Sequence, residues 1–194
     1  MGKVLVKDLV REAASYAGKE VEVSGWIRTN RDQKTFGFIS LNDGTHFNHV
    51  QIVYEKDHLP DFDRVSRLGV GSAITAKGIL ELTPEAKQPF EIKVHEIVVE
   101  GDSPEDYPIQ PKRHSVEFLR EVAHLRPRTN LFTAVFRVRS LLSYAIHCFF
   151  QERGFIYLHA PIITANDAEG AGADPLQRVW GSHPRSSAAV RNQG

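Results

Sequence analysis

The feature that most constrains the fold is a set of five short segments with strand character within the first hundred residues. They alternate apolar and polar residues or are rich in β-branched ones, and turn signals such as Asn42-Asp43-Gly44 separate them. Between the third and fourth segments there is room for a short helix. The five predicted strands are Val21–Asn30, Lys34–Leu41, Phe47–Tyr54, Ser72–Leu82 and Phe90–Glu100.

Five strands with a helical insertion after the third are typical of the OB-fold, a five-stranded β-barrel. Apolar residues at helical spacing over residues 5–17, followed by Gly18, predict a short helix before the barrel. Barrels of this kind often bind single-stranded nucleic acid or oligosaccharide, but the fold alone does not settle the ligand.

The rest of the chain predicts a second unit. Residues 102–113 contain three prolines and few apolar residues, which is typical of a linker between domains. A helix is then expected from Thr129 or Asn130 to Arg153, with Gly154 as its stop. Its apolar residues spread over so wide a face that it must be covered on more than one side, by a large domain or by another subunit.

Charge and composition narrow the class of protein. Basic and acidic residues both number 24, so no whole-molecule field attracts a polyanion, and such a site must be a local patch. One candidate patch is the stretch from Lys112 to Arg139, with seven basic and two acidic residues. Cys148 is the only cysteine and cannot form an internal disulfide. No apolar run is long enough to span a bilayer and no export peptide is recognisable at the start, so we expect a cytoplasmic protein.

Three stretches carry a family resemblance: VEVSGWIRTNRDQKTFGFISLNDGTHFNHVQIV, HSVEFLREVAHLRPRTN and GFIYLHAPIITANDAEGAG. Together they resemble the N-terminal part of a bacterial-type asparaginyl-tRNA synthetase, a class II enzyme of the aspartyl/asparaginyl subgroup. The resemblance covers residues 3–172. It implies an OB-fold anticodon-binding domain over residues 1–101, a linker over 102–113, and the start of an α+β class II catalytic domain over 114–172.

The same resemblance implies roles for five barrel residues. In the family, a Phe on the second strand stacks on the middle anticodon base and a Gln on the third reads the edge of that base, which corresponds to Phe38 and Gln51. The guanine-reading carboxylate corresponds to Glu91, because guanine presents two adjacent donors. Arg28 and Arg31 are expected to hold anticodon phosphates. The implied partner is an asparagine tRNA with a GUU anticodon.

Other conspicuous barrel residues receive no such role. Trp26 is expected to be a packing residue of the barrel rather than a platform on which a base stacks. His46 and His49 are three residues apart, but no cysteine or third histidine lies near them, so no metal site is predicted.

The helix and the strand after it resemble the first class II motif, which forms the homodimer interface and ends at a proline, here Pro161. Leu142 and Phe149 are expected on the dimer side of that helix. The phrase NDAEGAG resembles the loop that closes over the amino acid and the tRNA acceptor end, with Glu169 as its candidate functional side chain.

Members of the family use ATP and magnesium to activate asparagine, and arginines of the second and third motifs stabilise the reacting phosphate. Neither motif is present in these 194 residues. We therefore assign no catalytic residue, and expect the chain as given to bind tRNA, to hold no cofactor and to be inactive alone. Residues 173–194 depart from the family pattern and are interpreted as out-of-frame or foreign coding, or as a disordered end, with a diverged tail as the alternative.

Three other functions remain open on the sequence. The chain could be a non-catalytic RNA-binding protein that has kept the barrel. It could be a general single-strand binder, which would not prefer a GUU loop to scrambled RNA. An aspartyl-type synthetase, including the kind that charges both tRNAs, is disfavoured by NDAEGAG.

Overall fold

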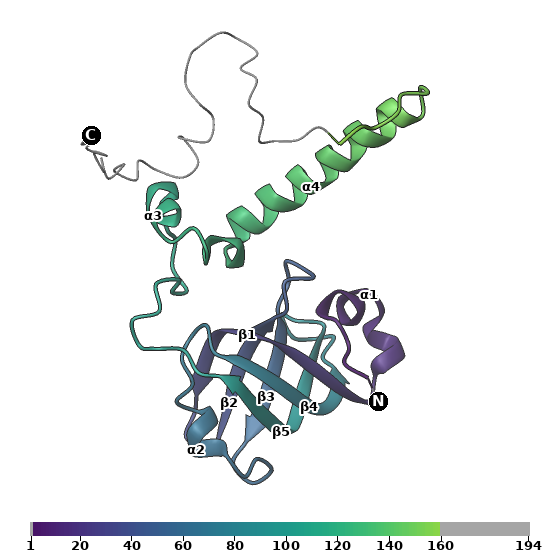
Figure 1. Ribbon diagram of the computed structural model, residues 1–194. Coiled ribbons are helices and arrows are strands. Elements are labelled where there is room, and N and C mark those ends of the chain that lie inside the picture. The colour runs from purple at the N-terminus through teal and green to yellow at the C-terminus, as the bar shows by residue number, and fades with distance from the viewer. Residues whose placement is uncertain (1, 160–194) are drawn as a thin grey trace, which may run out of the picture. The chain divides into compact units, whose positions relative to one another are not determined.

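The computed structural model describes residues 2–159 (Figure 1). The described residues fall into two units, 2–142 and 143–159, which divide within the last helix. The first contains the barrel and the segments that follow it as far as the middle of the last helix. Within the described part of the chain, no helix is long and apolar enough to cross a membrane.

The predicted five-stranded barrel is confirmed. Its strands close in the order β1-β2-β3-β5-β4, with β3 and β5 parallel and the other neighbours antiparallel. Closure leaves no sheet edge unpaired and turns one face of every strand inward. The strands are β1 (Glu20–Asp32), β2 (Phe36–Asn42), β3 (Val50–Glu55), β4 (Ala73–Leu82) and β5 (Phe90–Gly101).

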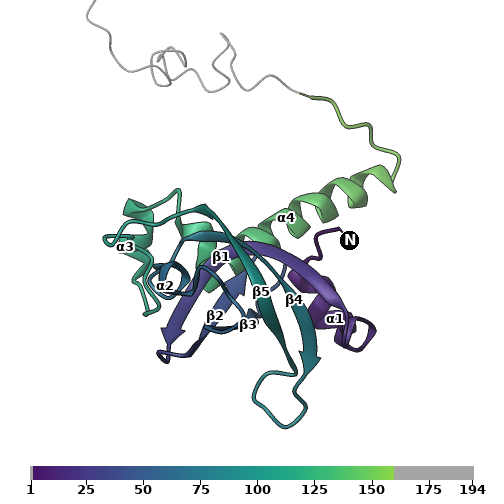
Figure 2. The same ribbon diagram turned by 90° about the horizontal axis from the view of Figure 1, so that it is seen from below.

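Two helices close opposite ends of the barrel (Figures 1 and 2). Helix α1 (Val6–Tyr16) contributes Val6 and Leu9 to the core. Helix α2 (Phe62–Val65) is the predicted insertion between β3 and β4, and both of its terminal residues are buried in the same core. The apolar positions of these two helices therefore complete the barrel interior.

Inside the barrel, Tyr54 on β3 faces Gly37 on β2. A β-carbon at position 37 would overlap with the Tyr54 ring, so glycine there is what admits the ring. The buried Tyr54 hydroxyl donates a hydrogen bond of 2.9 Å to the Asn30 side-chain carbonyl. Burial, and then the charge of Asp32, raise the pKa of Tyr54 to about 12.

Two predicted strand starts are wrong by two or three residues. The third strand begins at Val50 rather than Phe47, because the Asn42 amide donates to the carbonyls of His46 and Asn48 at 3.0 and 3.1 Å and holds the loop out of the sheet. The second begins at Phe36, since Lys34 adopts a turn conformation with φ of 71°.

The proline-rich segment after the barrel is anchored. Tyr107 and Ile109 are buried against Leu119 of helix α3 (Val116–Glu121), where Ser115 caps the first turn by accepting from the Phe118 amide at 3.2 Å. A single 3-10 turn, η1 (Arg126–Arg128), follows. Prolines in this stretch mark a change of direction, although part of the stretch is packed.

The predicted long helix is confirmed as α4 (Asn130–Gln151). The Thr129 hydroxyl accepts from the Phe132 amide at 3.4 Å at its start, and Gly154 adopts the positive φ of 79° typical of a residue that ends a helix. No residue of α4 is buried.

Candidate nucleic-acid interface

The outer face of β2, β3 and β5 brings together three of the predicted anticodon residues. Phe38, Gln51 and Glu91 are half-buried, while the next residue along each strand points into the barrel and is fully buried. Successive residues of a strand point to opposite faces, so all three side chains point outward. The inward neighbours are Ile39, Ile52 and Ile92.

The strand register arranges this face in two adjoining rows. In one row Gln51 pairs with Ser40 on one side and with Glu91 on the other. In the next row Phe38 pairs with Arg31 and Val53. Phe38 and Gln51 are therefore diagonal neighbours, at a distance that long side chains and a ring can bridge.

The polar groups in the first row already contact one another. The Gln51 amide nitrogen donates to a Glu91 carboxylate oxygen at 3.3 Å. The contact keeps the carboxylate and the amide oriented on one surface, where a base with adjacent donors and acceptors can meet both. Phe38 lies edge-to-face with Phe36 at 5.5 Å between ring centroids, which fixes its ring beside them.

Lys93 belongs to this face but was not predicted from the sequence. It pairs with Val53 and so extends the row of Phe38 and Arg31, and its ammonium lies 2.7 Å from Glu81. The hydrogen bond to Glu81 raises the pKa of Lys93. Strand alternation in PFEIKV places Lys93 on the face of Glu91, so the sequence held a signal for it.

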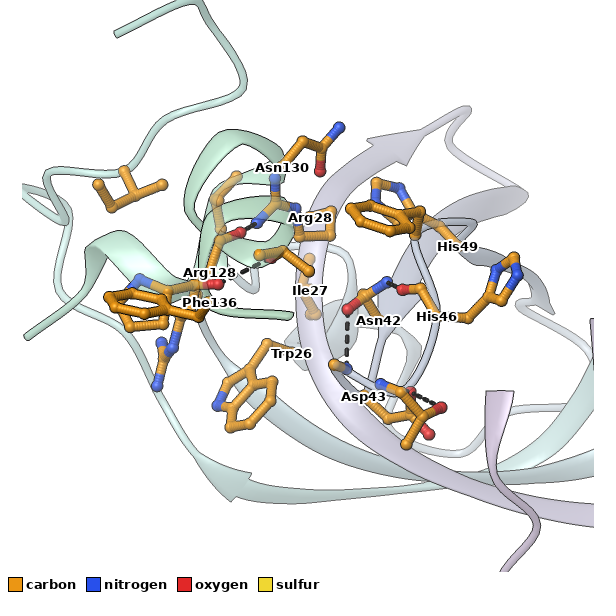
Figure 3. Close-up of a pocket in the computed structure, with 18 of the residues that line it drawn as sticks. Trp26, Ile27, Arg28, Asn42, Asp43, His46, His49, Arg128, Asn130 and Phe136 are labelled. Atoms are coloured by element: carbon orange, nitrogen blue, oxygen red, sulfur yellow. Dashed lines mark hydrogen bonds between the residues drawn. The ribbon is translucent and has the colours of Figure 1, made fainter. Parts of the chain in front are cut away.

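The two predicted arginines separate. Arg31 is exposed and pairs with Phe38, whereas Arg28 is half-buried and donates to the backbone carbonyl of Arg128 (Figure 3). Burial lowers the pKa of Arg28, nearby Tyr107 raises it, and the cation of Arg128 lowers it. Because Ile27 points inward, simple alternation along β1 would also turn Arg31 inward, but the register shifts against β2 between Ile27 and Thr29, and Arg31 therefore pairs with the outward-facing Phe38.

Trp26 packs on the outside of the barrel rather than in its core. Ile27 takes the inward position and is fully buried, which leaves Trp26 half-buried on the outside. The guanidinium of Arg128 lies 4.6 Å from the Trp26 ring centroid. A cation over an indole face is a favourable contact that occupies one side of the ring.

His46 and His49 make local hydrogen bonds. His46 Nδ1 accepts from the Asn48 amide at 2.9 Å, and His49 Nδ1 lies 3.3 Å from the Ser40 hydroxyl. Burial, and then the charge of Arg28, lower the pKa of His49. Among residues 2–159, no group of three or more His, Cys, Asp or Glu side chains is placed to hold a metal ion.

The predicted dimer residues Leu142 and Phe149 are open to solvent on α4, with exposed fractions of 58% and 48%. Pro161, Glu169 and the interpreted tail at 173–194 lie outside the described residues.

Comparison with known proteins gives the following relatives. A family described as "OB-fold nucleic acid binding domain" matches residues 21–100. The chain is 63% identical over 172 residues to the asparagine–tRNA ligase of Acetivibrio thermocellus and 62% identical over 168 residues to that of Acholeplasma laidlawii. These alignments cover 89% and 87% of the chain, but the chain spans only 37% and 36% of those relatives.

Solved structures give the same relationship. The asparaginyl-tRNA synthetase of Pyrococcus horikoshii, complexed with asparaginyl-adenylate, superimposes with a TM-score of 0.76 at 26% identity, covering 88% of this chain and 39% of that one. The enzyme of Entamoeba histolytica, also with asparaginyl-adenylate, gives 0.62 at 26% identity and covers 79% and 37%.

Proposed function

Since the chain is a homologue of the asparagine–tRNA ligases over 89% of its length, we propose that the outer face of its barrel binds the anticodon loop of a tRNA. The observation that carries this proposal is the register of β2, β3 and β5. This register brings an aromatic ring, an amide and a carboxylate next to one another, at Phe38, Gln51 and Glu91, which supports the proposal. Single-stranded bases are recognised by this combination of stacking and edge hydrogen bonds.

Each side chain of the face has a part in the proposal. In this proposal Phe38 stacks on the middle base, Gln51 reads that base, and Glu91 accepts from the two adjacent donors of a guanine; the GUU anticodon itself is what the resemblance to asparaginyl-tRNA synthetases implies. Arg31, which is exposed in the row of Phe38, holds a backbone phosphate. Arg28 can hold a phosphate of the same RNA only if its guanidinium leaves its contact with the Arg128 carbonyl.

At the level of the whole protein, we propose the ligase activity of the relatives: attachment of asparagine to its tRNA, with ATP and magnesium, in the cytoplasm. A second copy of the chain covers the apolar face of α4, on which Leu142 and Phe149 are exposed. The 194 residues contain no group to which we assign catalysis.

The anticodon proposal predicts a loss of RNA affinity when the stacking ring is removed. Phe38→Ala should cost about 1–3 kcal/mol in binding to an anticodon stem-loop carrying GUU, the usual value of one stacked base. Fluorescence anisotropy with labelled stem-loops measures this change. A loop of the same length with a scrambled anticodon should bind the unchanged chain more weakly.

Phe155→Ala is the matched control, because it removes an exposed ring that lies outside the barrel. It should leave stem-loop affinity unchanged. If Phe38→Ala folds and binds as well as the unchanged chain, the anticodon proposal fails. Equal affinity for the GUU and scrambled loops would instead indicate a general single-strand binder.

A further inference from the structure

A pocket of about 620 Å³ lies beside the barrel within the first unit (Figure 3). Neither Phe38 nor Gln51 lines it. One wall comes from β1 and the loop after β2, including Trp26, Arg28 and Phe47. The other comes from η1 and the first turns of α4, including Arg128 and Arg137. Its volume is within the range of pockets that hold small organic ligands.

Three arginine side chains line the pocket without a carboxylate partner in the described part of the chain. Arg28, Arg128 and Arg137 all line it, and none forms a salt bridge with any residue in the range 2–159. Their hydrogen bonds go to neutral groups: the Arg128 carbonyl, the Tyr107 hydroxyl at 3.0 Å, and the Gly44 carbonyl. Guanidiniums positioned by neutral acceptors keep donors and full charge for an anion.

The single carboxylate among the described lining residues does not neutralise this charge. Asp43 accepts from the Val6 amide through one oxygen, at 2.8 Å, and from the Thr45 amide and hydroxyl through the other, at 2.8 and 2.6 Å. Three arginines face one carboxylate among the described lining residues. The field in the pocket is therefore positive.

Aromatic rings accompany the cations. The Arg137 guanidinium lies 5.4 Å from the Phe47 ring centroid, and Phe47 is 44% exposed. Arg128 lies over the Trp26 ring, and Phe136 also lines the pocket. Rings interleaved with arginines match a ligand that carries both a phosphate and a planar base.

We propose that this pocket binds a nucleotide, with its phosphate against Arg128 and Arg137 and its base against Phe47. The nucleotide can be free or part of an RNA strand, and the inference rests on the proposed function only in the second case. It gives a role to Arg128 and Arg137, two of the seven basic residues between Lys112 and Arg139, to which the anticodon proposal assigns none.

The test compares Arg137→Gln with Arg139→Gln in the full 194-residue chain. Both arginines are exposed on α4, but only Arg137 lines the pocket, so the pair separates the site from general charge. One arm titrates a tRNA transcript with a scrambled anticodon loop at several salt concentrations. The other titrates adenosine and uridine 5′-monophosphates by isothermal calorimetry. Thermal unfolding verifies that both variants are folded.

If RNA supplies the nucleotide, Arg137→Gln should weaken transcript binding by roughly tenfold and lower the salt slope by about 1, while Arg139→Gln does neither. If a free nucleotide is the ligand, a mononucleotide should bind the unchanged chain and Arg139→Gln but not Arg137→Gln. Equal behaviour of the two variants in both arms overturns the inference. Loss of GUU preference in Phe38→Ala is independent of either arm, so failure here leaves the anticodon proposal intact.

Discussion

The barrel strands and helix α4 are both rich in apolar residues, but most of those in the strands are buried, whereas none of those in the helix is buried. Each barrel strand buries alternate side chains completely, as at Ile39, Ile52 and Ile92. Helix α4 buries none, and Leu141, Leu142 and Ile146 are more than half exposed. A sheet that closes on itself supplies its own cover, whereas a lone helix must obtain cover from elsewhere. Apolar content alone therefore does not determine burial.

The largest expected effect comes from a substitution that disrupts the pairing of strands β4 and β5 in the closed barrel. Gly78 lies at a register shift between β4 and β5, where an added β-carbon would overlap with the Lys93 carbonyl and lie 2.6 Å from the Val94 Cα. Because backbone atoms cannot move aside, Gly78→Ala should destabilise the barrel by more than about 4 kcal/mol. Urea unfolding measures this loss. Gly101→Ala, on β5 with open space around the new carbon, should be tolerated.

The next prediction compares one leucine from each region. Leu41 is fully buried on β2, so Leu41→Ala should cost about 2–5 kcal/mol of unfolding free energy. Leu142 is 58% exposed on α4, so Leu142→Ala should change it by less than about 0.5 kcal/mol in the monomer. Chemical denaturation of both variants at low protein concentration tests the difference.

Measuring the cost of the same two leucine substitutions at several protein concentrations tests whether a second copy covers α4. If a second copy covers α4, the cost of Leu142→Ala should rise with protein concentration while that of Leu41→Ala stays constant. Similar costs for the two variants at low concentration would contradict the contrast between the two regions.

The smallest expected effect concerns the proton of Tyr54 inside the barrel. The pKa of Tyr54 is raised from 10.0 to about 12, so the folded state holds the phenol proton more tightly than the unfolded state does. The resulting stability is complete below pH 10 and is lost as pH rises from 10 to about 12. Tyr54→Phe should remove this component of the alkaline slope.

Near neutral pH the same substitution should cost about 1–2 kcal/mol, because the Asn30 side-chain carbonyl loses its donor. Denaturant unfolding of both proteins at several pH values from neutral to strongly alkaline measures both effects. An identical alkaline slope in Tyr54→Phe would show that other groups cause it.

Much of the barrel could be predicted because the relevant signals are local. Alternation and turn residues located all five strands and the inserted helix, and the resemblance to asparaginyl-tRNA synthetases is confirmed by relatives at 62–63% identity. The errors fall where side-chain hydrogen bonds within a loop, or a shift in strand register, override the alternation of apolar and polar residues. Hydrogen bonds from Asn42 delay the third strand, and the register shift between Ile27 and Thr29 turns Arg31 to the outer face, where it pairs with Phe38.

The sequence by itself determined the strands, the helices and the resemblance to asparaginyl-tRNA synthetases, since periodicity, capping residues and motifs are written in neighbouring positions. Only the tertiary structure decided which side chains meet. The parallel pairing of β3 with β5 brings Gln51 to Glu91, and packing after the barrel brings Arg28 to Arg128. These pairs are 40 and 100 residues apart. Contacts over such separations follow from chain closure and burial, which no local pattern encodes.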